Sequence, residues 1–122
     1  MKFLALVSAT ALALLAETTF ATEIHWSSLD VFEHTATLAP GKSTELCGRI
    51  ESRSAVDWKF VGDGPLTFNI HRHSGEAVIY ATRSYMTREQ SGKFSPTFNF
   101  DWCWMWTNET VDPITLRVDL KR

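Results

Sequence analysis

The sequence lacks an excess of charge of either sign. Its 122 residues hold 12 Lys and Arg against 14 Asp and Glu, which gives a formal net charge of −2. Proteins that bind nucleic acids or anionic membrane surfaces concentrate positive charge on one face. We therefore expect no nucleic acid among the partners of this protein.

Recognisable catalytic motifs are also missing. The sequence contains no Gly-x-Ser-x-Gly elbow, no His-Glu-x-x-His pair and no phosphate-binding glycine loop. Each of these patterns places a nucleophile, a metal or a phosphate in the geometry that its chemistry needs. Their absence predicts that the protein is not an enzyme.

Long apolar runs are missing everywhere except at the N-terminus. There, Lys2 precedes an apolar stretch from Phe3 to Ala16, and small residues follow at positions 19 and 21. A membrane helix needs roughly 20 apolar residues, whereas a shorter run with these flanks is typical of a cleaved signal peptide. We predict a signal peptide over residues 1–21 and one domain over residues 22–122. The mature protein would have no membrane span and would be periplasmic or extracellular.

Cysteine is scarce, with only Cys47 and Cys103 present. Exported proteins fold in oxidising compartments, where paired cysteines form disulfides. We therefore predict one intramolecular disulfide between them. The alternative is that two free thiols serve as metal ligands.

The rest of the sequence is rich in turn signals and short alternating segments. Residues 55–61, 66–71 and 114–121 place apolar and polar residues alternately, as in strands with one face in the core and one in water. The segment 76–82 is apolar on both faces and predicts a more central strand. With no amphipathic helix after the leader, this pattern predicts an all-β fold, an antiparallel β-sandwich.

The segment from Phe98 to Trp106 carries a row of aromatic residues at every second position. If Cys103 forms a disulfide inside the core, strict alternation turns this row outward, unless a β-bulge shifts the register. Exposed tryptophans are strong binding residues. We therefore predict a binding surface at Trp102, Trp104 and Trp106, with the alternative that these rings fill the core.

Two histidines, His71 and His73, occupy alternate positions of one predicted strand. Their side chains would share a face, on the solvent side, and both could bind one copper or zinc ion. Two ligands are too few for zinc, and Met105 is a candidate for a further one. The alternative is a polar strand end that leads into the turn at Ser74-Gly75.

The stretch from Gly41 to Leu120 resembles a GOLD (Golgi dynamics) domain, the lumenal β-sandwich of cargo receptors that cycle between endoplasmic reticulum and Golgi. The resemblance rests on the order of several short motifs: Glu45-Leu46-Cys47, the Leu66–Ile70 run, Ser74-Gly75 before a strand, and the aromatic residues around Cys103 before Asn108. It implies a GOLD-like or jelly-roll-like sandwich with a disulfide and a role in protein or ligand binding. Those receptors continue into a coiled coil and a membrane helix, whereas this sequence ends at Arg122, so we do not expect a transmembrane receptor.

These observations predict an exported, non-catalytic binding module of the cell envelope or extracellular space. It would present an aromatic surface to an unknown protein or small ligand and would need no cofactor. The alternative function is a periplasmic metal-binding protein that holds copper or zinc through His71 and His73.

Overall fold

The computed structural model describes residues 21–122, and these residues form seven β-strands. The strands are β1 (Ala21–Glu23), β2 (Val31–Leu38), β3 (Ser43–Ile50), β4 (Val56–Ser74), β5 (Ala77–Phe94), β6 (Phe100–Thr107) and β7 (Ile114–Lys121). Within this part of the chain, no helix is long and apolar enough to cross a membrane. The predicted signal peptide lies outside the described residues except for Ala21, which begins β1.

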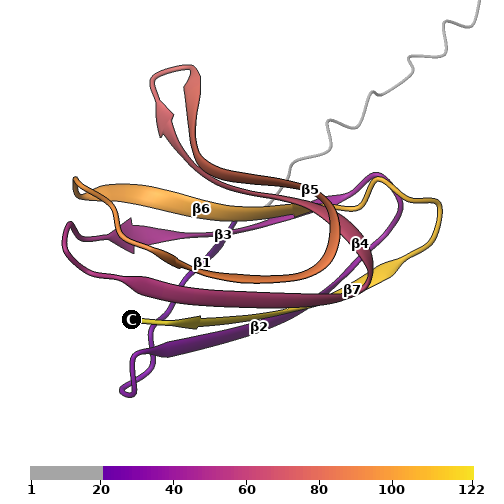
Figure 1. Cartoon of the computed structure of the whole chain (residues 1–122), viewed down its shortest axis with the longest axis horizontal. Coiled ribbons are helices and arrows are strands. Elements are labelled where there is room, and N and C mark those ends of the chain that lie inside the picture. The colour runs from indigo at the N-terminus through magenta and orange to yellow at the C-terminus, as the bar shows by residue number, and fades with distance from the viewer. Residues whose placement is uncertain (1–20) are drawn as a thin grey trace, which may run out of the picture.

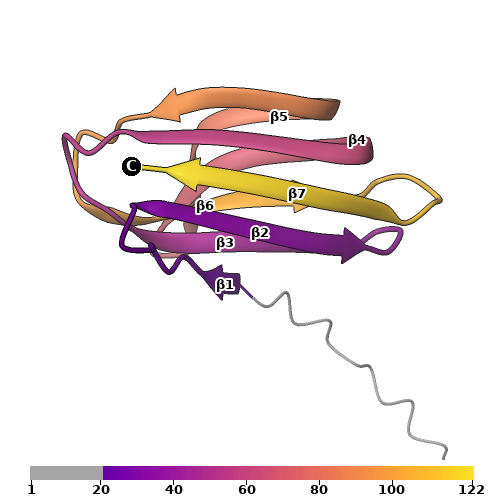
Figure 2. The same ribbon diagram turned by 90° about the horizontal axis from the view of Figure 1, so that it is seen from below.

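The strands curl into two packed layers, which confirms the predicted all-β sandwich. The hydrogen-bonded order is β1-β3-β6-β4-β7-β2, with β5 beside β4. Figure 2 shows β5, β4, β7 and β2 side by side in one layer, with β6 and β3 behind them. One pair departs from the predicted antiparallel arrangement, because β1 runs parallel to β3.

The long strands β4 and β5 form a bent hairpin that belongs to both layers. The first part of β4 pairs with β7, from Asp57 to Gly62, and its later part pairs with β6, from Thr67 to His71. Beyond the last of these pairs, the tip of the hairpin extends past the sandwich (Figure 1). The hairpin therefore links the two layers of the curled sheet, and its tip extends beyond them.

The core follows from the period-two pattern of the strands. In β7, every second residue from Ile114 to Leu120 is buried, as predicted. Trp58 and Phe60 of β4 are likewise buried and contact Phe68 farther along the same strand. An apolar face on each strand is thus removed from water between the two layers.

The disulfide between Cys47 and Cys103 is present, but it does not lie in the core. The two cysteines are directly paired residues of β3 and β6. Their neighbours Leu46 and Trp104 are also paired and are fully buried in the core. Because adjacent residues of a strand point to opposite faces, the disulfide occupies the outer face of this sheet. The predicted disulfide is therefore confirmed, and the condition under which the aromatic row would face outward does not hold.

Candidate functional site

The prediction that Trp102, Trp104 and Trp106 form an exposed binding surface is wrong. Trp104 and Trp106 are fully buried, and Trp102 is only 8% exposed. Trp106 packs against its direct partner Phe68 in the same layer and against Phe60 in the part of β4 that pairs with β7. No bulge was needed to bury these rings, because the disulfide takes the opposite face of β6. The three tryptophans belong to the core.

The outer face of β3, β6 and the later part of β4 carries a polar cluster instead. The strand register places two rows of paired residues across this face: Glu45, Met105 and Asn69 in one row, and Cys47, Cys103 and His71 in the next. Directly paired residues of antiparallel strands share a face and lie close together. His73 follows two residues after His71, so it extends the same face toward the hairpin tip.

The centre of this cluster is formed by Glu45, His71 and His73. The Nε2 atom of His71 lies 3.1 Å from a carboxylate oxygen of Glu45. The two imidazole rings are 5.1 Å apart between centroids and nearly perpendicular. One ligand atom from each of the three residues lies within 4.8 Å of the other two. Two nitrogen donors and one oxygen donor are therefore close enough together to be candidate ligands of one ion.

His71 is held in place by hydrogen bonding and by burial. Its Nδ1 atom lies 2.6 Å from Oδ1 of Asn69, and its side chain is 4% exposed. Burial lowers the pKa of His71 below its usual value, and this effect outweighs the opposing attraction of the Glu45 carboxylate; the nearby His73 lowers the pKa further. Burial thus favours the uncharged imidazole of His71, whose Nδ1 faces an amide oxygen.

The sequence located this cluster only in part. His71 and His73 do share a face, as their spacing predicted, but His71 is buried whereas the prediction placed it on the solvent side. Met105 lies in the adjacent row of the same face. Glu45 and Asn69 were not predicted as site residues, since their approach to His71 depends on the pairing of β3, β6 and β4. Cys47 and Cys103 are joined to each other, so the alternative of two free thiols as metal ligands is wrong.

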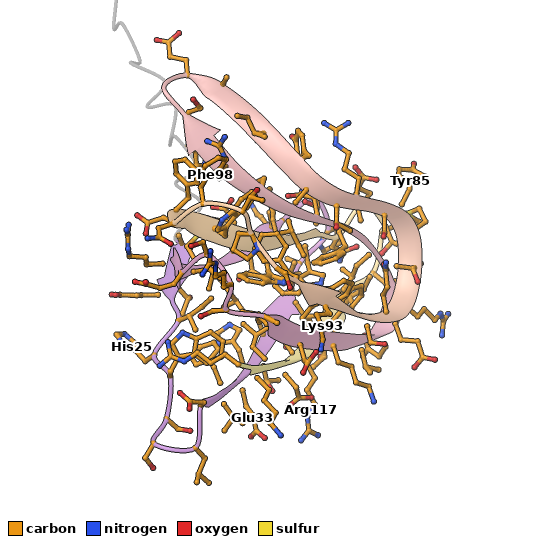
Figure 3. The ribbon with its side chains drawn as sticks, turned by 60° about the vertical axis from the view of Figure 1, so that its left-hand side comes forward. His25, Glu33, Tyr85, Lys93, Phe98 and Arg117 are labelled. Carbon is orange, nitrogen blue, oxygen red and sulfur yellow. A yellow bond between two sulfur atoms is a disulfide. The ribbon has the colours of Figure 1, made fainter. Side chains whose placement is uncertain are left out.

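A second candidate site lies on β5. We call it the hairpin surface and define it by five exposed large apolar residues of this strand: Val78, Ile79, Tyr80, Tyr85 and Met86. Their exposed fractions run from 38% to 77%. Tyr85 lies on the outside of the bend of β5 and points away from the sandwich (Figure 3). The prediction that residues 76–82 form a central strand was wrong, because within residues 21–122 β5 pairs only with β4.

Local backbone geometry explains why two of these side chains face water. The pairing between β4 and β5 shifts register around Leu66 and Phe68, and Met86 lies opposite this shift with a φ of 50°. A residue other than glycine rarely adopts this left-handed conformation. The resulting bulge bends β5 and leaves Tyr85 and Met86 exposed side by side.

Tyr80 is the residue of the hairpin surface that borders the polar cluster. Its ring meets that of His71 at a centroid distance of 6.1 Å, and the Arg83 guanidinium lies 3.6 Å from the ring centroid of Tyr80. His71 and Tyr80 are also a directly paired couple of β4 and β5. The two candidate sites are therefore adjacent.

A shallow hollow of about 540 Å³ lies on the outer face of the other sheet. Acidic and basic side chains alternate around it, from Glu33 and Asp57 to Lys59 and Lys121. Glu33, Lys93 and Arg117 project from this side of the molecule (Figure 3). The mixture of signs gives the hollow no preference for an anion or a cation.

Comparisons with known proteins define the class of fold. No family model matches the sequence, and no curated protein matches it. Among solved structures, the chain is similar to PliG of Aeromonas hydrophila, a periplasmic inhibitor of g-type lysozyme, with a TM-score of 0.56 and 6% sequence identity over 83% of this chain and 94% of PliG. A de novo designed double-stranded β-helix aligns with a TM-score of 0.45 and 20% identity, over 73% of this chain and 97% of the design.

The chain thus has a β-rich fold that it shares with a periplasmic protein. The comparisons do not support the GOLD family specifically, although the resemblance correctly indicated a β-fold with a disulfide. An intramolecular disulfide such as Cys47–Cys103 is typical of proteins that fold in an oxidising compartment.

Proposed function

We propose that the protein is an exported, non-catalytic binding module that attaches to another protein through the β4–β5 hairpin. The observation that carries this proposal is the hairpin surface on an edge strand. Val78, Ile79 and Tyr85 are all exposed on this one strand, on both of its faces. Several large apolar side chains exposed on a single projecting element are candidates for contact with a partner.

The position of β5 supports the same conclusion. Strand β5 is 18 residues long and forms hydrogen bonds to β4 along one edge. A long edge strand offers unpaired N–H and C=O groups, to which an extended segment of a partner can add as a further strand. Apolar side chains on such an edge would supply affinity, while the backbone would set the orientation of the partner.

A lysozyme of the g type is the first partner to test. PliG, which has a similar fold, is described as a periplasmic inhibitor of this enzyme. An inhibitor needs a rigid scaffold and a projecting element that reaches into its target. The sandwich with its disulfide would supply the scaffold, and the hairpin tip in Figure 1 would supply the projection.

The experiment measures binding of the oxidised protein to g-type lysozyme by biolayer interferometry and measures inhibition of peptidoglycan lysis in parallel. We expect the double variant Ile79→Ala/Tyr85→Ala to weaken binding by at least about tenfold, which is the loss of one strong interface residue. Circular dichroism would show that the variant keeps the strand content of the parent.

The matched control is Leu29→Ala/Val111→Ala, since both of these residues are apolar and highly exposed but lie outside the hairpin. This control should bind as the parent does. Equal loss in both double variants would contradict the hairpin as the contact surface. If the parent protein does not bind g-type lysozyme, this lysozyme is not its partner. Co-purification of proteins from envelope extracts with the parent and the same two double variants would then test whether the hairpin binds any protein.

A further inference from the structure

We propose that Glu45, His71 and His73 bind one divalent transition-metal ion at the base of the β4–β5 hairpin, copper(II) more tightly than zinc(II). This site is independent of the proposed protein partner. It stands on the convergence of three donor atoms, on the orientation of one imidazole and on the chemistry of the donor set.

The first argument is distance. Zinc and copper bonds to histidine nitrogen and carboxylate oxygen are about 2.0–2.2 Å long, so ligand atoms around one ion lie about 3–4 Å apart. In this protein the donor atoms of all three residues lie within 4.8 Å of one another, and those of Glu45 and His71 are 3.1 Å apart. His73 is exposed, so its side chain has room to adjust toward the other two donors when an ion binds.

The second argument concerns the two nitrogens of His71. Oxygen atoms face both of them, from Asn69 on Nδ1 and from Glu45 on Nε2. A neutral imidazole has a single N–H, so it can donate to only one of these oxygens. With the proton on Nδ1 and directed at Asn69, the lone pair of Nε2 faces the carboxylate. A cation between Nε2 and Glu45 satisfies both groups.

This is the arrangement that metal-binding histidines adopt in general. The nitrogen that does not bind the metal donates to a carbonyl or carboxylate, which fixes the tautomer and the orientation of the ring. Asn69 provides such an acceptor at 2.6 Å. Asn69 is therefore a positioning residue for His71.

The third argument is the donor set. Two imidazoles and one carboxylate suit zinc and copper, and at a given site of nitrogen and oxygen ligands copper(II) binds more tightly than zinc(II). Three protein ligands leave room for water or for another group. Met105 lies in the row that contains Glu45 and Asn69, so its thioether is on the same face.

A bound ion would join elements that are distant in the sequence. Glu45 belongs to β3, whereas His71 and His73 belong to the part of β4 that leads into the hairpin tip. Within residues 21–122, β3 and β4 do not pair directly, because β6 lies between them, and the disulfide on this face joins β3 to β6. The ion would fix the angle at which the hairpin leaves the sheet.

The test is isothermal titration calorimetry of the oxidised protein with copper(II) and, separately, with zinc(II), followed by electron paramagnetic resonance of the copper complex. We expect one ion per chain, tighter binding of copper than of zinc, and a copper spectrum with two nitrogen ligands. His73→Ala and Glu45→Gln should each weaken copper binding by at least about tenfold, and His73→Ala should leave one nitrogen ligand. Asn69→Ala should weaken it by about 10- to 100-fold, as for other outer residues of metal sites.

The matched control is His25→Ala, because His25 is an exposed histidine outside the cluster. The four single variants all change side chains that are at least partly accessible, so circular dichroism should show that each of them folds. His71 is not replaced in this test, because it is buried and its loss carries a risk of misfolding. The proposal is overturned if neither metal binds at micromolar concentration, if His73→Ala and Glu45→Gln bind copper as the parent does, or if His25→Ala abolishes binding. Tighter binding of zinc than of copper would overturn the stated preference.

Discussion

At the scale of single residues, Gly92 shows how one missing side chain fixes the packing of a large one. A Cβ atom added at Gly92 would lie 2.5 Å from the Trp58 ring, which is closer than non-bonded atoms approach. Gly92 and Trp58 are directly paired residues of β5 and β4. The glycine therefore leaves the space into which the indole of Trp58 fits.

We predict that Gly92→Ala lowers the free energy of unfolding by about 1–3 kcal/mol, the usual cost of overpacking. Ser91→Ala, at the neighbouring exposed position, should change it by less than about 0.5 kcal/mol. Urea denaturation followed by tryptophan fluorescence measures both. Equal stability of Gly92→Ala and the parent would show that Trp58 can take another position at little cost.

His71 gives a prediction about pH in the metal-free protein. Its folded pKa lies below the ordinary value of 6.5, chiefly because burial disfavours the charged ring. The unfolded chain then binds more protons than the folded one, so the stabilising contribution is present above pH 6.5 and is lost as the pH falls through the folded pKa.

The free energy of unfolding should therefore fall between about pH 7.5 and about pH 5.5, on either side of the ordinary histidine pKa. Urea titrations in the presence of a chelator measure this change. His71→Gln should show a smaller dependence on pH over this interval, and His25→Ala should keep the dependence of the parent. A parent whose stability rises on acidification would contradict the direction of the shift.

At the scale of elements, β6 has one face in the core and one face on the outside of the sandwich. Trp104 pairs with Leu46 on β3 and with Ile70 on β4, and all three are fully buried. The indole N–H groups of Trp102, Trp104 and Trp106 find no acceptor among residues 21–122. Their contribution to stability is therefore apolar packing, reduced by the cost of the unpaired N–H groups.

We predict that Trp104→Ala lowers the free energy of unfolding by about 3–5 kcal/mol, the usual cost of removing a large buried aromatic ring. Phe98→Ala removes an aromatic residue of the same alternating row, but this ring is 68% exposed, so its loss should change stability little. Thermal denaturation distinguishes the two variants. Similar effects of both substitutions would contradict the separation of the row into a buried part and an exposed end.

The alternation of β6 could be predicted from the sequence, but the side that it turns to the core could not. Period-two spacing correctly separated Trp102, Trp104 and Trp106 from Cys103 and Met105. Which set is buried depends on where the disulfide lies, and Cys47 and Cys103 are paired on the outer face. Residues 76–82 show the same limit of sequence patterns. They are as hydrophobic as a central strand, and yet they belong to an edge strand of the sheet.

The candidate metal site was predictable to the same limited extent. The spacing of His71 and His73 is local, and a strand places both side chains on one face whatever the rest of the fold does. The approach of Glu45 is not local, because β6 lies between β3 and β4. The contact therefore depends on the register of two strand pairs, and a single sequence carries no direct signal of that register.

At the scale of the whole molecule, the disulfide closes a long loop between strands that are distant in the sequence. Cys47 and Cys103 are separated by 56 residues. A cross-link over a loop of this length reduces the conformational freedom of the unfolded chain and contributes about 4 kcal/mol in the chain-entropy model. This covalent tie holds the sheet that carries the polar cluster.

We predict that Cys47→Ala/Cys103→Ala lowers the free energy of unfolding by about 2–4 kcal/mol. Chemical denaturation with and without a reducing agent provides the measurement. Reduction should destabilise the parent by a similar amount and should leave the double variant unchanged. A parent that is insensitive to complete reduction would show that packing alone holds β3 to β6.

The pairing of β2 with β7 also sets the order in which the fold can be completed. Val31 at the start of β2 lies opposite Lys121 near the end of β7, so almost the whole described chain separates them. The β4–β5 hairpin, by contrast, closes through a short turn between Ser74 and Ala77. A chain that is synthesised or translocated from its N-terminus can form this hairpin early. Strand β2 pairs with β7 alone among the described strands, so it stays unpaired until β7 has been made. During that interval the nascent protein needs protection against aggregation through this exposed strand.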